Sequence, residues 1–305
     1  MPGSLMDMLN EGIVLGDGGM FLEANWRGYD VPGIIGSHPD ALQQIHRDFY
    51  NSGSEVLQAL TWFTSGAQLE EKYGWGGRVD EINRTGIRAA KEASGWEAPV
   101  GGCLVTTMKG SQLGDKAYNP EDPSSGARAQ AEWEEQIAIL VDAGADFLIP
   151  ETFFRLDEMR LCVESCKKTG LPTMALMGIG SKKQTRDGAN AAECARTLVD
   201  DGADIVGTVC IGDPGEMLPT ALEMREAVDV PIACQPKGFR QMADTEGVSY
   251  AVRRHRNGVT PDDMGAFALK ARSEGINFVG CCCGAGPSHI RAMAEALGKP
   301  TSMPD

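Results

Sequence analysis

Long apolar runs are absent from this 305-residue chain. No stretch approaches the roughly 18 consecutive apolar residues that a membrane-spanning helix needs. Residues Met1–Asn10 also lack the basic start and the apolar core of a signal peptide. We therefore expect a cytoplasmic protein that has no membrane partner.

Basic residues are outnumbered by acidic ones. The chain has 28 Lys and Arg against 43 Asp and Glu, a net charge of −15. Such a surface repels phosphate backbones and anionic headgroups, so nucleic acid and anionic membranes are poor partners. Small molecules remain the expected binding partners, and a homo-oligomer stays open.

A disulfide framework is also missing. The nine cysteines are an odd number in a long chain without a secretion signal. Both features indicate reduced thiols. Thiolates are therefore available to bind a metal.

What the chain does have is a regular alternation of short apolar runs and amphipathic segments. We predict strands at Ile13–Leu15, Glu55–Thr61, Val100–Thr106, Asp146–Pro150, Thr173–Met177, Ile205–Cys210, Ile232–Gln235 and Phe278–Cys282. We predict helices at Pro39–Asn51, Val79–Ala93, Ala127–Asp142, Leu156–Lys168, Asn190–Asp200, Glu216–Ala227, Pro261–Ser273 and Ser288–Leu297. Each strand is followed by a helix.

A short glycine-containing turn recurs where a helix ends and a strand begins. It is found at Gly53, Gly144, Gly202 and Gly275, and glycine suits the left-handed position that follows a helix. Eight strand–helix units in this length predict an α/β fold, a single (β/α)8 TIM barrel, with a doubly wound sheet as the alternative. We find no linker, since 118–126 is short enough to be a loop, so residues 1–305 are expected to form one domain.

Three consecutive cysteines, Cys281, Cys282 and Cys283, end the last predicted strand, and Cys210 ends the sixth. Successive strand side chains point to opposite faces, so three adjacent thiols are not explained by one apolar site. Metal binding with Cys210 is favoured over a buried, thiol-rich strand end. A regular strand would pair Cys281 with Cys283, whereas a break at Gly284 would pair Cys282 with Cys283.

Other strand ends also carry candidate residues, because barrels place function at the carboxyl ends of their strands. Asp17 and Gly18 could hold a cationic group, although a plain turn explains them too. Thr61, Trp62 and Phe63 could line a pocket, or Trp62 and Phe63 could pack in the core. Glu151 is a lone carboxylate that ends an apolar run, and a helix cap is its alternative role.

Several of these segments resemble the homocysteine S-methyltransferase family, above all its betaine–homocysteine branch. The matching stretches are Ile13–Gly19, Arg27–Tyr29, His46–Phe49, Gly207–Cys210, Gln235–Pro236, Gly280–Gly284 and Pro287–Arg291. The resemblance implies a zinc enzyme whose metal is held by Cys210, Cys282 and Cys283, with Cys281 a bystander. It also implies that Asp17 and Glu151 orient homocysteine.

The resemblance implies a betaine-like onium compound as the methyl donor, with methionine as the product. Phe63 and Thr152 stand where that branch has tyrosines, and 31–39 contains no tryptophan. A thinner aromatic cage keeps a sulfonium donor, dimethylsulfoniopropionate or S-methylmethionine, as the alternative. A non-catalytic thiol–zinc protein is a second alternative. A cysteine-nucleophile enzyme ranks lower, because only His289 lies near the cluster.

Overall fold

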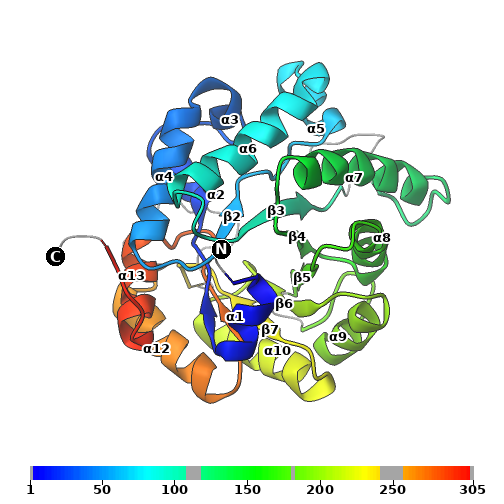
Figure 1. Cartoon of the computed structure of the whole chain (residues 1–305). Helices are drawn as coiled ribbons and strands as arrows, with labels where there is room; N and C mark the ends of the chain where they lie inside the picture. Colours follow the sequence, from blue (N-terminus) through cyan, green and yellow to red (C-terminus); the bar gives the residue numbers. More distant parts are fainter. Residues whose placement is uncertain (1–2, 108–117, 180–182, 241–256, 303–305) are drawn as a thin grey trace.

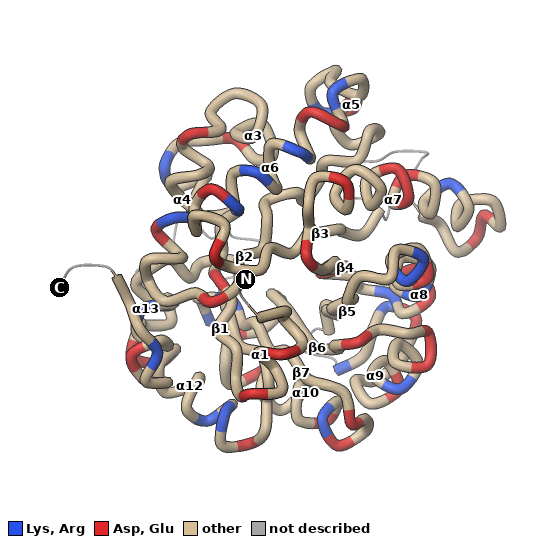
Figure 2. Tube along the Cα trace, in the orientation of Figure 1, with Lys and Arg blue, Asp and Glu red and all other residues tan. Residues whose placement is uncertain are grey.

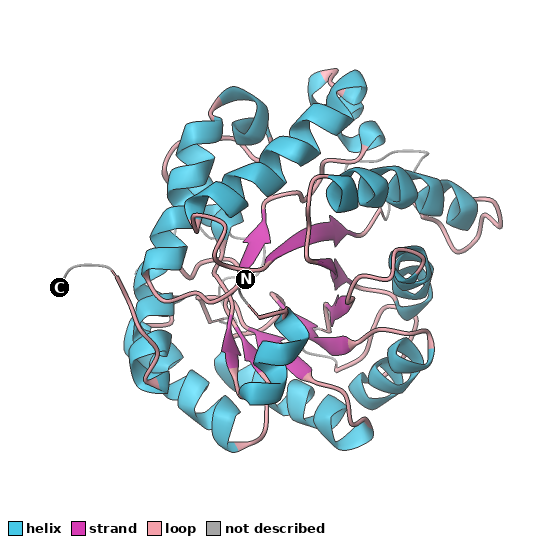
Figure 3. Ribbon diagram, viewed as in Figure 1, coloured by secondary structure: helices cyan, strands magenta, loops and turns pink. Residues whose placement is uncertain are grey.

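The structure is a computed structural model, and it describes residues 3–107, 118–179, 183–240 and 257–302. Its strands form one curled, eight-stranded sheet of parallel pairs in the order β1-β8-β7-β6-β5-β4-β3-β2, ringed by helices (Figures 1 and 3). The strands are β1 Val14–Leu15, β2 Leu57–Ala59, β3 Val100–Val105, β4 Phe147–Phe153, β5 Met174–Met177, β6 Ile205–Val209, β7 Ile232–Gln235 and β8 Phe278–Val279. The predicted (β/α)8 barrel is confirmed.

The outer helices complete eight strand–helix units. They are α4 Pro39–Asn51, α6 Val79–Ala93, α7 Ser125–Asp142, α8 Leu156–Lys167, α9 Ala191–Asp200, α10 Pro214–Ala227, α12 Pro261–Ser273 and α13 Pro287–Leu297. Further short helices are α1 Leu5–Glu11, α2 Met20–Trp26, α3 Gly33–Ser37, α5 Gly66–Tyr73 and the 3-10 turn η1 Gly76–Arg78. All eight predicted helices are confirmed, and the short ones were missed because one or two turns carry little periodicity.

The four glycine turns have the predicted conformation, with φ of 107° at Gly53, 95° at Gly144, 101° at Gly202 and 81° at Gly275. The predicted strand ends need correction. β6 stops at Val209 and β8 at Val279, so Cys210 and Cys282 lie in the turns that follow. The periodicity could not show this, because an apolar turn residue continues the apolar run of its strand.

Two apolar layers hold the barrel together. The inner layer fills the barrel with strand side chains such as Phe147, Ile149 and Phe278, and Leu5 and Leu9 of α1 pack against it. Figure 1 shows α1 lying across the near end of the ring. The outer layer joins the strands to the surrounding helices. Since α1 covers the end where the strands begin, the opposite end is where a site can open.

The seam between β1 and β2 is closed by a backbone hydrogen bond together with two side chains. The Glu55 backbone N–H donates to the Leu15 carbonyl at 2.8 Å, and the Leu15 N–H donates to the Glu55 carboxylate at 2.9 Å. Further along, the Gln58 N–H donates to the Asp17 carboxylate at 2.9 Å. Two carboxylates therefore accept where strand carbonyls would otherwise do so.

The outer surface is rich in acidic residues, which Figure 2 shows spread over helices and loops around the whole ring. Among the described residues, no helix has both the length and the apolar character to cross a bilayer. The charged residues interleave in sequence and form many ion pairs on the outer helices, such as Arg160 with Asp201 at 2.7 Å.

Candidate functional site

Three thiols meet at the end of the barrel opposite α1. Cys210 follows β6, Cys282 and Cys283 follow β8, and their Sγ atoms all lie within 4.8 Å of one another. The turn after β7 aligns them: the Cys210 N–H donates to the Gln235 carbonyl at 3.0 Å and the Cys282 N–H to the Pro236 carbonyl at 2.8 Å. The backbone at the end of β7 thus holds the turns after β6 and β8, which carry the three thiols.

The spacing and electrostatics of the three thiols suit a soft metal ion. A tetrahedral zinc site with Zn–S bonds of about 2.3 Å separates its sulfurs by roughly 3.8 Å, which is compatible with this cluster. Hydrogen bonds from Cys282 and Cys283 lower the pKa of Cys210 well below its usual value. The same contacts with Cys210 raise the pKa of Cys282 and Cys283, so the cluster favours one thiolate, and a bound metal would displace the protons of the other two thiols.

Cys281 faces away from this cluster. Its Sγ lies 3.3 Å from the Met293 sulfur and 3.9 Å from the Met264 sulfur, between α12 and α13. Burial raises the pKa of this thiol. The structure therefore brings Cys282 and Cys283 to Cys210, and the pairing of Cys281 with Cys283 that a regular strand would produce is not formed.

A pocket of about 400 Å³ opens beside the thiols. Its lining combines the cluster with aromatic, acidic and basic side chains. The lining residues are Gly19, Phe21, Trp62, Phe63, Val105, Thr106, Glu151, Thr152, Phe154, Arg186, Cys210, Cys282 and Cys283. Of the predicted substrate contacts, Trp62, Phe63 and Glu151 line this pocket.

Glu151 supplies a buried carboxylate to the pocket. The indole N–H of Trp62 donates to its Oε1. Burial raises the pKa of Glu151 to about 8, even though the hydrogen bonds from Trp62 and Cys103 act in the opposite direction. Burial thus favours the neutral carboxyl group, and a cation bound beside it would favour the carboxylate.

The other predicted contacts lie outside the described pocket lining. Asp17 is buried, and its two oxygens accept from the Gln58 N–H and side-chain amide, each at 2.9 Å. Burial raises the pKa of Asp17 to about 7. A side chain at Gly18 would meet Phe49 at 2.5 Å, and the Thr61 hydroxyl donates to the Cys103 carbonyl at 2.8 Å. Substrate contact by these three residues stays a prediction.

Among the described residues, three of the five non-glycine residues with positive φ line the pocket, and the other two are Trp96 and Lys183. Phe63, Thr152 and Cys210 have φ of 61°, 59° and 70°, in the left-handed region that side chains other than glycine seldom occupy. Each follows or ends a different strand and lines the pocket. Strained residues gathered at one place indicate that their side chains are aimed there for a purpose.

Sequence reasoning missed several lining residues. Phe21 lies on α2, with its ring centroid 6.2 Å from that of Phe63, and Phe154 follows β4. The aromatic lining is therefore fuller than Trp62 and Phe63 alone. Phe154 could have been predicted from the sequence, since it comes only three residues after the candidate residue Glu151. Phe21 and Arg186 lie in a missed helix and a long loop, where no periodicity marks them.

Comparisons with known proteins identify relatives of this chain. A family model described as homocysteine S-methyltransferase matches residues 14–297. Betaine–homocysteine S-methyltransferase 1 of Danio rerio is 31% identical, with 96% of this chain and 75% of that protein covered. S-methylmethionine–homocysteine S-methyltransferase of Pongo abelii is 30% identical, with 96% and 81% covered.

Solved structures share the fold. The homocysteine methyltransferase MmuM of Escherichia coli, in its oxidized form, superposes with a TM-score of 0.75 at 17% identity, covering 96% of this chain and 98% of that one. Its metallated form superposes with a TM-score of 0.74. Taken with the match over 14–297, these relatives show that the chain belongs to the homocysteine S-methyltransferase family.

Proposed function

We propose that this protein transfers a methyl group from a small onium compound to the sulfur of homocysteine, giving methionine. The observation that carries the proposal is the thiol cluster of Cys210, Cys282 and Cys283, which opens onto a pocket lined by aromatic rings and an acid. We treat residues 1–305 as one homocysteine-binding domain whose partners are small molecules.

The three thiols would hold a zinc ion. When bound, the ion would act as a Lewis acid that keeps a fourth sulfur ligand as a thiolate at neutral pH. Three protein thiols leave one tetrahedral position for the substrate, and Cys281 is turned away, so the described residues do not form a closed four-cysteine site. This arrangement favours the transferase over a purely structural zinc protein.

The acids would orient homocysteine. Glu151 faces the pocket, and the substrate ammonium group would lower its raised pKa by pairing with the ionised carboxylate. Trp62 and Cys103 both hydrogen-bond the Glu151 carboxyl group, and the substrate amino group would be a further donor to it. Asp17 interacts electrostatically with Glu151 and, when ionised, would add negative charge to the same region.

The aromatic side chains would hold the donor. Phe21, Trp62 and Phe63 line the pocket, and a positively charged nitrogen or sulfur over an aromatic ring face is attracted to it by roughly 0.5–2 kcal/mol. In the reaction, a new S–CH3 bond forms as the bond from the methyl carbon to the onium atom breaks. The bonding pair stays with the departing atom, which becomes neutral.

A donor panel tests this function. Zinc-loaded protein is incubated with homocysteine and, separately, with betaine, dimethylsulfoniopropionate, S-methylmethionine or methyltetrahydrofolate, and methionine is measured. We expect methionine from an onium donor, with betaine-type donors the leading class and sulfonium donors the alternative. Absence of methionine with every donor would reject the proposal.

Trp62→Ala should lower kcat/KM for the preferred donor.

Glu151→Gln tests the acceptor side. The amide keeps the shape of the side chain but cannot carry a negative charge, so kcat/KM for homocysteine should fall. Zinc content should stay unchanged, and the variant should unfold at no lower urea concentration than the wild type at neutral pH, because the amide removes a buried group whose raised pKa costs stability there. Unaltered kinetics would remove Glu151 from the substrate site.

A further inference from the structure

Arg186 is the one arginine or lysine among the described residues that line the pocket. We propose that its guanidinium binds the carboxylate of the methyl donor, so that the donor is a zwitterion with an onium centre and a carboxylate a few bonds apart. This inference rests on the proposed function and adds a specificity residue to it.

The loop that carries Arg186 is anchored to the start of α8. The Arg186 N–H donates to the Phe154 carbonyl at 2.7 Å, and the guanidinium lies 4.6 Å from the centre of the Phe154 ring. The next residue, Asp187, accepts from the Leu156 and Asp157 N–H groups, each at 3.0 Å. The guanidinium is therefore positioned beside the pocket by backbone and side-chain bonds.

Phe154 links Arg186 to the thiol side of the pocket. A side chain placed at Gly178, after β5, would lie 3.0 Å from the Phe154 ring and 3.3 Å from Ile211. Ile211 directly follows Cys210, so Arg186, Phe154 and the thiol cluster succeed one another along one wall. The guanidinium and the thiols thus line the same pocket, in which the donor would bind.

The charges of the pocket favour a zwitterion. A donor must carry its methyl on a cationic atom, and a donor with no other charge would be repelled by Arg186. A carboxylate near the onium centre turns that repulsion into a bidentate ion pair, because the planar guanidinium fork matches a carboxylate. S-methylmethionine carries a further ammonium group beside its carboxylate and should fit less well than betaine or dimethylsulfoniopropionate.

Depth in the pocket assigns Arg186 to the donor and not to homocysteine. Glu151 is 3% exposed. Arg186 is an exposed residue at the rim of the pocket, and its guanidinium stacks on Phe154, which comes three residues after Glu151 in the chain. The amino and carboxylate groups of homocysteine share one carbon atom. A substrate whose amino group pairs with buried Glu151 therefore keeps its carboxylate deep, while the rim is left to the second substrate.

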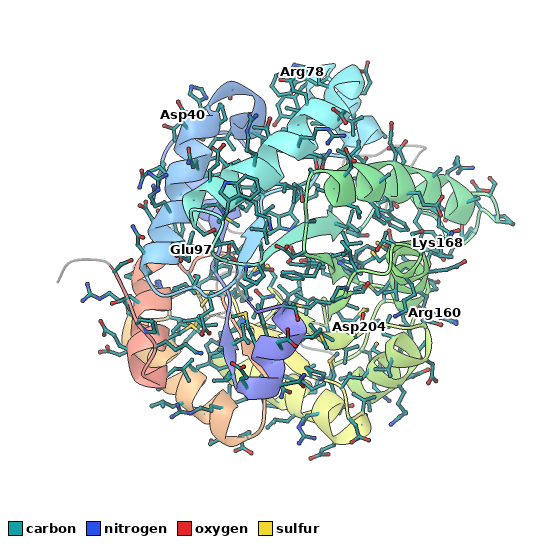
Figure 4. All side chains as sticks on the ribbon, in the orientation of Figure 1. Asp40, Arg78, Glu97, Arg160, Lys168 and Asp204 are labelled. Atoms are coloured by element: carbon teal, nitrogen blue, oxygen red, sulfur yellow. The ribbon has the colours of Figure 1, made fainter. Side chains whose placement is uncertain are left out.

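Calorimetric titration of the zinc-loaded protein with betaine and with choline tests the inference. Choline keeps the trimethylammonium group and replaces the carboxylate with a hydroxymethyl group. We expect the wild type to prefer betaine, and Arg186→Gln to reduce that preference roughly tenfold or more. Arg186→Lys should lie between the two. Arg160→Gln is the matched control, since Arg160 is an arginine at the outer edge of the molecule (Figure 4).

Three results would overturn the inference: no betaine preference in the wild type, a preference that survives Arg186→Gln, or a loss of homocysteine affinity in that variant. Homocysteine affinity is measured in parallel for this reason. Failure of the proposed function is seen separately, as absence of methionine in the donor panel. A protein could thus bind betaine through Arg186 and still prove not to transfer its methyl group.

Discussion

Cys281 and Cys282 are adjacent in the chain and have opposite surroundings. Cys281 is 2% exposed and packs between methionine sulfurs, while the Cys282 thiol faces Cys210 and the pocket. β8 ends at Val279, so the chain turns through the cysteines and strand alternation no longer applies. The backbone turn therefore directs the Cys281 side chain into the core and the Cys282 side chain toward the pocket.

Substitution of single cysteines should separate these environments. We expect Cys210→Ala, Cys282→Ala and Cys283→Ala to lose most of the bound zinc, because each removes one of three thiolate ligands. Cys281→Ala should keep about one zinc per chain and lose some stability through the cavity it leaves. Metal analysis of the purified variants is the measurement. Zinc retained in Cys282→Ala but lost in Cys281→Ala would show that the cluster is wrongly assigned.

The buried carboxyl group of Glu158 should make the stability of the protein depend on pH. It accepts from the Thr106 hydroxyl at 2.6 Å and the Thr107 N–H at 2.7 Å, and burial raises its pKa from 4.5 to about 7. As the pH rises, the Glu158 carboxyl group therefore ionises at a lower pH in the unfolded chain than in the folded protein. The stability that Glu158 contributes is therefore present below about pH 4.5 and is lost by about pH 7.

Glu158→Gln should remove this dependence, because the amide does not titrate. Relative to the wild type, the variant should gain up to about 3 kcal/mol between pH 4.5 and 7. Urea unfolding of both proteins across that range measures the difference, and the contributions of Asp17 and Glu151 cancel in it. A difference that does not vary with pH would contradict the raised pKa.

At the scale of elements, the site depends on two turns packed together. Gly19 begins α2, and a side chain there would lie 2.3 Å from the Cys282 carbonyl and 3.0 Å from the Cys283 Cα. The Cys281 N–H also donates to the Asp17 carbonyl at 3.0 Å. The turn after β1 thus sets the position of the turn after β8 that carries Cys282 and Cys283.

Gly19→Ala should displace Cys282 and Cys283, since both contacts lie on backbone and cannot yield by side-chain rotation. We expect weaker zinc binding, seen as faster metal loss to a chelator, with the barrel still folded. Gly77→Ala is the control, because nothing lies within 4 Å of a side chain at Gly77. Equal zinc retention in the two variants would argue against the packing of these turns as the cause.

At the scale of the whole molecule, the barrel closes through a carboxylate. Glu55 accepts from the Leu15 N–H across the seam and pairs with Lys299, which follows α13, at 2.6 Å. The seam joins the first unit to the second, and Lys299 ties the end of the last unit to the same acid. One side chain therefore connects the start and the end of the described barrel.

Glu55→Ala should destabilise the protein by about 1–3 kcal/mol, because it leaves the buried Leu15 N–H without its acceptor. Glu55→Gln keeps an acceptor oxygen and should cost less. The free energy of unfolding in urea is the measurement, with Glu71→Ala on the exposed face of α5 as the control. If Glu55→Ala cost no more than the control, the seam would not depend on this side chain.

The order of the elements and the thiol chemistry of the candidate metal site follow from the sequence alone. Helical periodicity, glycine stops and apolar runs are local properties, so eight units could be read from neighbouring residues. Thiols that follow the sixth and eighth strands lie near each other in any barrel with this order of strands. Cys210 with two of the last three cysteines was therefore predictable.

Only the tertiary structure decided which thiol turns away and what surrounds the cluster. Cys281 is separated from its neighbours by a backbone turn, and Phe21, Phe154 and Arg186 reach the pocket from three different segments. The burial that raises the pKa of Glu151 likewise comes from strands distant in sequence. These properties depend on distances between segments, and residue types along one chain do not specify such distances.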